Sequence, residues 1–249
     1  MRMSRRRDSG GLWALGFRLS AVSLSTVQHD IVTCSRCERL RTYCAEIARV
    51  KRAAFRNDIY WGKPVPGFGD ADARVLILGL APAAHGANRT GRVFTGDGGG
   101  GSGDFLMAAL HKHGFANIAT SQSIDDGLRL TDAFIAAAVR CAPPDNTPTP
   151  EEILTCQSHL EAEVAQLKKV EVVVALGKIA FDVWWRVMAG RGLAVRPRPP
   201  FAHGAVYTPR GGPSVIASYH PSRQNTNTGK LTPAMMASVL GKARRAVTP

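Results

Sequence analysis

The chain has 249 residues, of which 45% are hydrophobic, so it can form one large domain with a buried core or two small ones. It carries 32 lysines and arginines against 19 aspartates and glutamates, a formal net charge of +13. This charge favours a polyanionic partner, nucleic acid in particular, over a protein that is merely basic and soluble. No run approaches the roughly 18 consecutive apolar residues of a membrane span, which argues against a membrane as the partner.

The first 25 residues are interpreted as a basic arm that precedes the fold. Three arginines, Arg5 to Arg7, stand before an apolar stretch, which is the order found in a secretory signal peptide. Arg18 interrupts that stretch, and no clear small-residue cleavage site precedes the first pair of cysteines. We therefore expect residues 1–25 to be a disordered arm, or an over-extended start, and residues 26–249 to be a single domain.

Short apolar runs alternate with amphipathic stretches along the rest of the chain. Strands are predicted over residues 74–79, 131–141, 171–177 and 214–219. Helices are predicted over residues 38–56, from 104, from 150 to about 166, from 178 to about 188, and from 233. Thr149 is expected to cap the helix that begins at Pro150. The alternation predicts one α/β domain with a mainly parallel sheet.

A polar loop over residues 79–97 follows the first predicted strand, and we expect the ligand site there. Open α/β sheets bind their ligands at the carboxyl ends of the strands. The loop contains His85, Phe94 and Asp97, a set suited to stacking a flat group and polarising it. Residues 98–103 are glycine-rich, but no phosphate-binding or dinucleotide-binding motif is present, so no nucleotide cofactor is predicted.

Four of the five cysteines predict a metal or cluster site. Cys34 and Cys37 form a Cys-x2-Cys pair, and Cys141 and Cys156 lie fifteen residues apart, which leaves Cys44 over. An odd number of cysteines argues against a secreted disulfide framework and favours a reducing, cytoplasmic compartment. The spacing leaves a zinc ion, an iron–sulfur cluster and buried thiols that act as small hydrophobes as alternatives.

Several motifs occur in one order along the chain. They are Gly-Leu-Ala-Pro at 79–82, Gly-Arg-Val-Phe-Thr-Gly-Asp at 91–97, Arg-Cys-Ala-Pro-Pro at 140–144 and His-Pro-Ser at 220–222. With the cysteine pattern, this set resembles the uracil-DNA glycosylase superfamily, in particular its iron–sulfur-containing family 5, or type B, enzymes. The resemblance runs from about Ile31 to about Ala246, nearly the whole chain apart from the arm.

The resemblance implies a three-layer α/β/α fold with a central, mainly parallel four-stranded sheet. It implies a [4Fe–4S] cluster, with zinc as the lesser alternative, on Cys34, Cys37, Cys141 and Cys156. The implied reaction is hydrolysis of the N-glycosidic bond of a deaminated base in double-stranded DNA, which leaves an abasic site. Uracil is the expected substrate, and hypoxanthine, xanthine and etheno-cytosine are candidates because type B enzymes look broader than uracil-only ones. We expect a monomer in the bacterial or archaeal nucleoid.

The chain departs from the family pattern at two positions. Many relatives have a carboxylate or an asparagine, which positions the attacking water, where this chain has Ala81. The asparagine that reads the edge of uracil in other families would fall near Ala137. A pocket without these polar groups is expected to discriminate less among bases. Two rival functions remain open: a non-catalytic metal- or iron–sulfur-bearing nucleic-acid-binding protein, and an iron–sulfur electron carrier.

Three side chains are the catalytic candidates. Bond cleavage places negative charge on the departing base. A hydrogen-bond donor aimed at a base oxygen is therefore expected to lower the reaction barrier more than any other group. His220 follows the last predicted strand and can supply that donor. Asp97 is the leading carboxylate to orient the water or to favour the cationic sugar. Asn146, after the Pro-Pro turn, is the other candidate for contact with the base or the water.

Further residues are predicted to bind the substrate. Phe94 is expected to be the surface on which the flipped base stacks. The backbone N–H groups of Leu80 and Ala81 are candidates to bind a second base oxygen. Polar side chains after the last strand are expected to grip phosphates and to fill the gap that the flipped base leaves. The remaining candidates are His85 and Asn88 in the pocket and Ser222 and Arg223 at the DNA.

Overall fold

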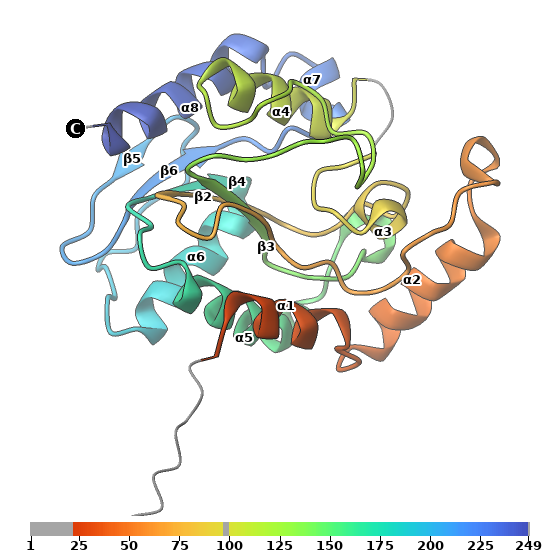
Figure 1. Ribbon diagram of the computed structural model, residues 1–249. Helices are drawn as coiled ribbons and strands as arrows, with labels where there is room; N and C mark the ends of the chain where they lie inside the picture. The colour runs from red at the N-terminus through yellow and green to blue at the C-terminus, as the bar shows by residue number, and fades with distance from the viewer. Residues whose placement is uncertain (1–21, 97–99, 249) are drawn as a thin grey trace, which may run out of the picture.

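The computed structural model describes residues 22–96 and 100–248 and has a six-stranded sheet in the order β1-β3-β2-β4-β6-β5 (Figure 1). The inner strands, all mutually parallel, are β2 (Val75–Gly79), β3 (Ala133–Ala137), β4 (Val172–Leu176) and β6 (Ser214–Ser218). They confirm the four predicted strands. The structure adds two short antiparallel edge strands, β1 (Phe68–Gly69) and β5 (Val206–Tyr207).

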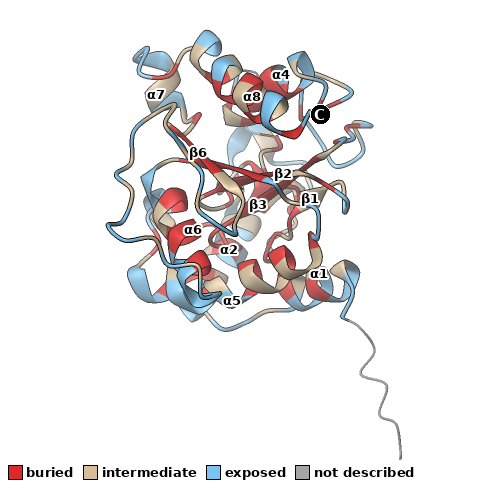
Figure 2. Cartoon of the chain, turned by 90° about the vertical axis from the view of Figure 1, so that its left-hand side faces the viewer, coloured by how far each residue is buried: buried red, intermediate tan, exposed pale blue. Residues whose placement is uncertain are grey.

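Helices cover both faces of the sheet, as the α/β/α prediction requires (Figures 1 and 2). Their bounds are α1 Leu24–Val32, α2 Glu38–Val50, α3 Ala87–Thr90, α4 Ser102–Lys112, α5 Pro150–Gln166, α6 Lys178–Gly190, α7 Arg223–Asn227 and α8 Pro233–Val247. Short 3-10 turns occupy Ala53–Phe55 and Pro144–Asn146. No helix in 22–96 or 100–248 is both long enough and apolar enough to cross a membrane.

Alternation along the central strands divides the core into two layers. Val75 and Ile77 of β2 pack in the cluster that includes α4 and α8. Leu76 and Leu78 pack in the opposite cluster, with α5 and α6. The buried sheet therefore lies between two helical layers whose outer surfaces are exposed (Figure 2). Because both faces are covered, the four inner strands can be continuously apolar.

Helix boundaries show where local signals sufficed. Thr149 accepts a hydrogen bond from Glu152 N, and the Glu152 side chain binds Thr149 N, so a capping box starts α5 at Pro150 as predicted. The predicted helix over 38–56 is too long, because Lys51 takes a left-handed conformation (φ 59°) that ends α2 at Val50. Leu24 begins α1, inside the arm expected over 1–25, and the arm's first 21 residues lie outside the described part.

A buried ion pair fixes the chain just beyond β3. Arg140 and Glu163 of α5 are 2.7 Å apart, with side chains 1% and 0% exposed. Glu163 also accepts a hydrogen bond from Gly67 N at 2.8 Å. Buried charges need such pairing, since one left alone would carry a large desolvation penalty. The pair therefore holds the backbone that presents Cys141 against α5.

Candidate active site

The fold brings Phe94 and His220 together at the carboxyl edge of the sheet. Phe94 belongs to the segment after β2, and His220 follows β6. Their ring centroids are 5.8 Å apart, and the ring planes are tilted by 30°. Both residues are partly exposed, so a ligand can reach the two rings from solvent. The sequence prediction that these residues share a site agrees with this geometry.

Two glycines let Phe94 take its position. Phe94 has φ of 51°, an unusual backbone for a residue with a side chain. A Cβ at Gly79 would lie 2.9 Å from Phe94 Cε2, and a Cβ at Gly103 would lie 2.3 Å from Phe94 O. The contact at Gly103 is with backbone and cannot be relieved, so that position needs glycine, whereas a Cβ at Gly79 would push the Phe94 ring aside. The conformation of Phe94 is therefore imposed by close backbone packing around it.

Gly79→Ala is expected to lower kcat/KM for uracil release about 10- to 100-fold, because the added methyl group displaces the Phe94 ring, on which the flipped base is predicted to stack. The control is Gly190→Ala at the end of α6, where the nearest atom to an added Cβ is 3.7 Å away. Steady-state kinetics of both variants check the prediction. Equal kcat/KM values for the two would contradict it.

His220 is fixed by the turn into α7. The Asn225 side-chain amide donates to His220 O at 2.8 Å, and Ser222 caps α7 by accepting from Asn225 N. Burial lowers the pKa of His220 to about 4. The imidazole is therefore neutral at pH 7, and it can donate an N–H hydrogen bond without carrying a charge.

Arg92 holds the segment that carries Phe94. Its guanidinium, only 4% exposed, donates to Thr95 Oγ1 at 2.9 Å, to Ser121 Oγ at 3.1 Å and to Asp126 at 2.7 Å. Burial alone would raise the pKa of Asp126. The hydrogen bond from Arg92 and two backbone N–H groups outweigh burial and lower that pKa to about 2. Arg92 therefore braces the pocket from inside and is not free to bind DNA.

His85 and Asn88 have different surroundings. His85 Nδ1 shares a 2.9 Å hydrogen bond with the Tyr60 hydroxyl, and burial, followed by nearby Arg52 and Arg89, lowers the His85 pKa. Asn88 is fully buried, and its amide donates to Cys44 O and Ala84 O at 3.3 Å each. This geometry favours a bracing role for Asn88 between α2 and α3 over contact with a base.

The other predicted site residues are more exposed or lie outside the described residues. Leu80 and Ala81 are partly exposed just after β2. Asn146 is exposed with φ of 54°, and among the described residues no hydrogen bond or ring contact joins it to Phe94 or His220. Two more residues complete the predicted set: Arg223, exposed at the start of α7, and Asp97, outside the described part of the chain.

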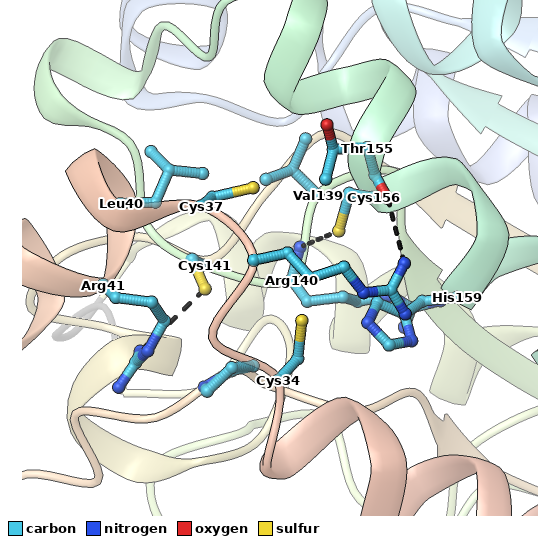
Figure 3. A pocket seen from close by; sticks show the side chains of 12 residues that line it. Cys34, Cys37, Leu40, Arg41, Val139, Arg140, Cys141, Thr155, Cys156 and His159 are labelled. Atoms are coloured by element: carbon cyan, nitrogen blue, oxygen red, sulfur yellow. Dashed lines mark hydrogen bonds between the residues drawn. The ribbon is translucent and has the colours of Figure 1, made fainter.

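The four predicted cysteine ligands line one cavity (Figure 3). Cys34 and Cys37 come from the α1–α2 connection, Cys141 follows β3, and Cys156 lies on α5. Their sulfur atoms face a common centre in Figure 3. Cys44 does not line this cavity, although it is buried on α2 in the same cluster as Cys141 and Cys156, and its thiol donates to Ala142 O at 3.5 Å.

The cavity does not have the geometry of a single-ion site. In residues 22–96 and 100–248, no group of three or more histidine, cysteine or acidic side chains is placed to hold one metal ion. Burial, followed by neighbouring Cys141 and Cys34, raises the pKa of Cys37, and burial raises that of Cys156 to about 11. Arg140 N donates to Cys156 Sγ at 3.2 Å. The four thiols therefore line one cavity without forming a group arranged around a single metal ion.

Comparison with known proteins gives this site a family. Residues 66–244 match the Uracil DNA glycosylase superfamily. The type-5 uracil-DNA glycosylase of Mycobacterium tuberculosis is 48% identical over 226 residues, which cover 90% of this chain and 82% of that protein. The type-5 uracil-DNA glycosylase of Thermus thermophilus is 49% identical over 215 residues, which cover 86% of this chain and 94% of that protein. The predicted resemblance is confirmed: the chain belongs to the uracil-DNA glycosylase superfamily, in its type-5 group.

Proposed function

We propose that this protein hydrolyses the N-glycosidic bond between uracil and deoxyribose in double-stranded DNA and leaves an abasic site. The observation that carries the proposal is the neutral His220 imidazole beside the Phe94 ring, at the sheet edge where α/β folds bind ligands. Relatives named type-5 uracil-DNA glycosylase, with identities up to 49%, support it. The net charge of +13 suits a DNA substrate.

The reaction begins when uracil leaves the base stack, at a free-energy cost of a few kcal/mol, and stacks on Phe94. As the C1′–N1 bond breaks, electrons move onto the base and positive charge develops on the sugar. The His220 N–H donates a hydrogen bond to one carbonyl oxygen of the base. The backbone N–H groups of Leu80 and Ala81 donate to the other carbonyl oxygen. Water adds its oxygen to C1′, and its proton balances the charge of the departing base.

The water needs a polar group to orient it. Ala81 cannot do so, because its methyl side chain has no hydrogen-bonding atom. Asp97 is the proposed carboxylate, and it also favours the positive charge on the sugar. Asn146 is the alternative, since its exposed side chain is free to approach bound DNA. Asn88 is omitted from the contacts with the base because it is buried inside the loop.

The proposed substrate range extends beyond uracil to hypoxanthine, xanthine and etheno-cytosine. Ala137, at the end of β3, is 3% exposed and offers no side-chain donor or acceptor to the edge of a base. A site rejects an analogue strongly only when its own polar groups would be left unpaired. With alanines at positions 81 and 137, few groups are available to reject a purine or an alkylated pyrimidine.

The cysteine cavity fits a [4Fe–4S] cluster better than zinc. One ion needs its ligands at about 2.3 Å, and the described residues contain no group so arranged. Four thiols that line one cavity match the ligand set of a cubane cluster. Cys34, Cys37, Cys141 and Cys156 would hold it, and it would join the α1–α2 connection to α5 and to the end of β3. We propose a structural role for it.

A cleavage panel tests the proposed function. Duplexes with one uracil, hypoxanthine, xanthine or etheno-cytosine are incubated with the protein and then heated in alkali, which breaks the strand at abasic sites. Breakage at uracil is expected, with breakage at some of the other bases. Binding without breakage at any base would replace the proposal with a non-catalytic nucleic-acid-binding protein.

If the neutral His220 imidazole is the active form, the rate of uracil release should not change between about pH 5.5 and 8. The reason is that the pKa of His220 is about 4, so the imidazole stays neutral over this whole range. Protonation becomes appreciable only as the pH falls toward that pKa. An unperturbed histidine would instead lose activity around its ordinary pKa of about 6.5. Single-turnover rates across this range check the prediction, and a midpoint near pH 6.5 would contradict it.

A further inference from the structure

The loop over residues 51–60, which connects α2 to the chain before β1, projects from the molecule on the same side as α3 (Figure 1). It carries Ile59, whose exposed fraction of 95% is the greatest of any large hydrophobic side chain in the described residues. A single exposed aliphatic side chain is ordinary on a protein surface. The residues around Ile59, however, indicate a function for this exposed side chain.

Arg89 of α3 clamps this loop against the candidate site. Its guanidinium lies 4.0 Å from the centre of the Phe55 ring and pairs with Asp58. It also donates to Gly96 O, just after the segment that carries Phe94. The residue after Ile59 is Tyr60, whose hydroxyl is hydrogen-bonded to His85 in the loop over residues 79–97 that also carries Phe94. The residues on both sides of Ile59 are therefore tied to the 79–97 segment that carries Phe94.

The clamped loop is basic. Lys51, Arg52 and Arg56 lie in it, and none of them pairs with an acidic side chain within the described part of the chain. Its single acid, Asp58, is already neutralised by Arg89. An exposed apolar side chain among basic residues without acidic partners suits insertion into DNA from a surface that binds phosphates.

Base flipping needs a side chain to fill the space that the base leaves. The segment 222–230 is the element predicted to do this, and it consists of Ser, Arg, Gln, Asn, Thr, Asn, Thr, Gly and Lys. It has no aliphatic or aromatic side chain. An apolar wedge beside these polar groups would have to come from another element, and Ile59 lies on a loop that Arg89 and Tyr60 tie to the 79–97 segment.

We propose that the 51–60 loop is a second DNA-binding element, whose Ile59 inserts into the base stack beside the flipped nucleotide. Lys51, Arg52 and Arg56 contact the phosphates on either side of the insertion. The partner is duplex DNA, since a single strand has no continuous stack to wedge open. This inference rests on the proposed glycosylase function, and the experiment separates the two.

Single-turnover uracil release is measured on two substrates: a fully paired duplex, and the same duplex with the uracil inside an unpaired bubble. In the bubble the base is already unstacked, so a wedge contributes less. Ile59→Ala is expected to lower the ratio of the duplex rate to the bubble rate about tenfold. A tenfold change in rate corresponds to an activation barrier that is higher by about 1.4 kcal/mol. Ile59→Leu is expected to restore most of the ratio. Val206→Ala, at an aliphatic side chain 49% exposed on edge strand β5, should leave the ratio within about twofold.

An unchanged ratio in Ile59→Ala would overturn the inference, and so would an equal loss on both substrates, which would mean that the loop supports the pocket itself. No release by the wild-type protein from either substrate would instead overturn the proposed function. In that event, 2-aminopurine next to the lesion tests the wedge without chemistry. Its fluorescence should rise when wild-type protein binds and should stay low with Ile59→Ala, and equal signals would refute the wedge.

The charges of the loop have their own test. Replacing Arg52 and Arg56 together by alanine is expected to reduce the slope of log Kd against log salt concentration by about two, since each phosphate contact contributes about 0.9. Arg191→Ala, at the end of α6, is the control. A slope equal to that of the control would remove the phosphate contacts from the proposal.

Discussion

Replacing His220 with alanine is expected to slow single-turnover uracil release about 100- to 1,000-fold, the usual loss when one donor to a developing negative charge is removed. The expected effect is large because burial keeps this imidazole neutral and it lies beside the Phe94 ring, on which the base is proposed to stack. Affinity for uracil-containing duplex should change little, because binding relies mainly on phosphate contacts.

The matched control is His111→Ala, at an exposed histidine in the last turn of α4. It should retain the wild-type rate. Circular dichroism and visible absorbance check that fold and cluster are intact in both variants. A rate for His220→Ala within about threefold of wild type would show that His220 contributes less than 1 kcal/mol to the barrier, and it would refute the assigned role.

Replacing Cys156 with alanine is expected to abolish the brown colour and the bound iron of the purified protein. The loss should also lower the free energy of unfolding by about 4–5 kcal/mol, the chain-entropy contribution of a cross-link that closes a loop of about 100 residues. Cys156 lines the same cavity as Cys34 and Cys37, which lie far away in the sequence, so the proposed cluster would cross-link them. Iron analysis and denaturant unfolding measure the two effects.

Cys44→Ala is the control, because Cys44 is also a buried cysteine but lies outside the proposed ligand set. It should keep its iron and its colour. Stoichiometric zinc in a colourless wild-type protein would contradict the cluster. Full iron content in Cys156→Ala would contradict this choice of ligands.

The central sheet and the long helices could be predicted because their signals are local. The inner strands are short apolar runs, and α5 begins at Pro150 because Thr149 and Glu152 cap it. The edge strands β1 and β5 have two residues each, too few for any periodic pattern. The end of α2 depends on the backbone conformation of Lys51, which the helical pattern of the sequence does not indicate.

The candidate site was predictable where motif residues themselves form it. Phe94 and His220 come from two motifs that the family resemblance joins, and they meet in the fold. The bracing residues were missed because their partners lie far away in the sequence: Arg89 pairs with Asp58, and Arg92 pairs with Asp126. In the sequence, nothing distinguishes these two arginines from the other basic residues that give the chain its net positive charge.

The prediction for Asn88 shows the same limit. Its polar side chain in a glycine-rich loop suggested a pocket contact, whereas the fold turns the amide inward to bind Cys44 O and Ala84 O. Residue type alone cannot separate these outcomes, because a buried amide and a ligand-binding amide both need hydrogen-bond partners. Only the direction of the side chain decides between them.

The most direct test of the account is the release of free uracil from a duplex with one uracil–guanine pair, measured with enzyme in excess. The predicted result is one uracil for each duplex, matched by one alkali-labile site, with His220→Ala slower by about 100-fold or more. Tight binding of the duplex with no free uracil, or equal release by wild type and His220→Ala, would contradict the account.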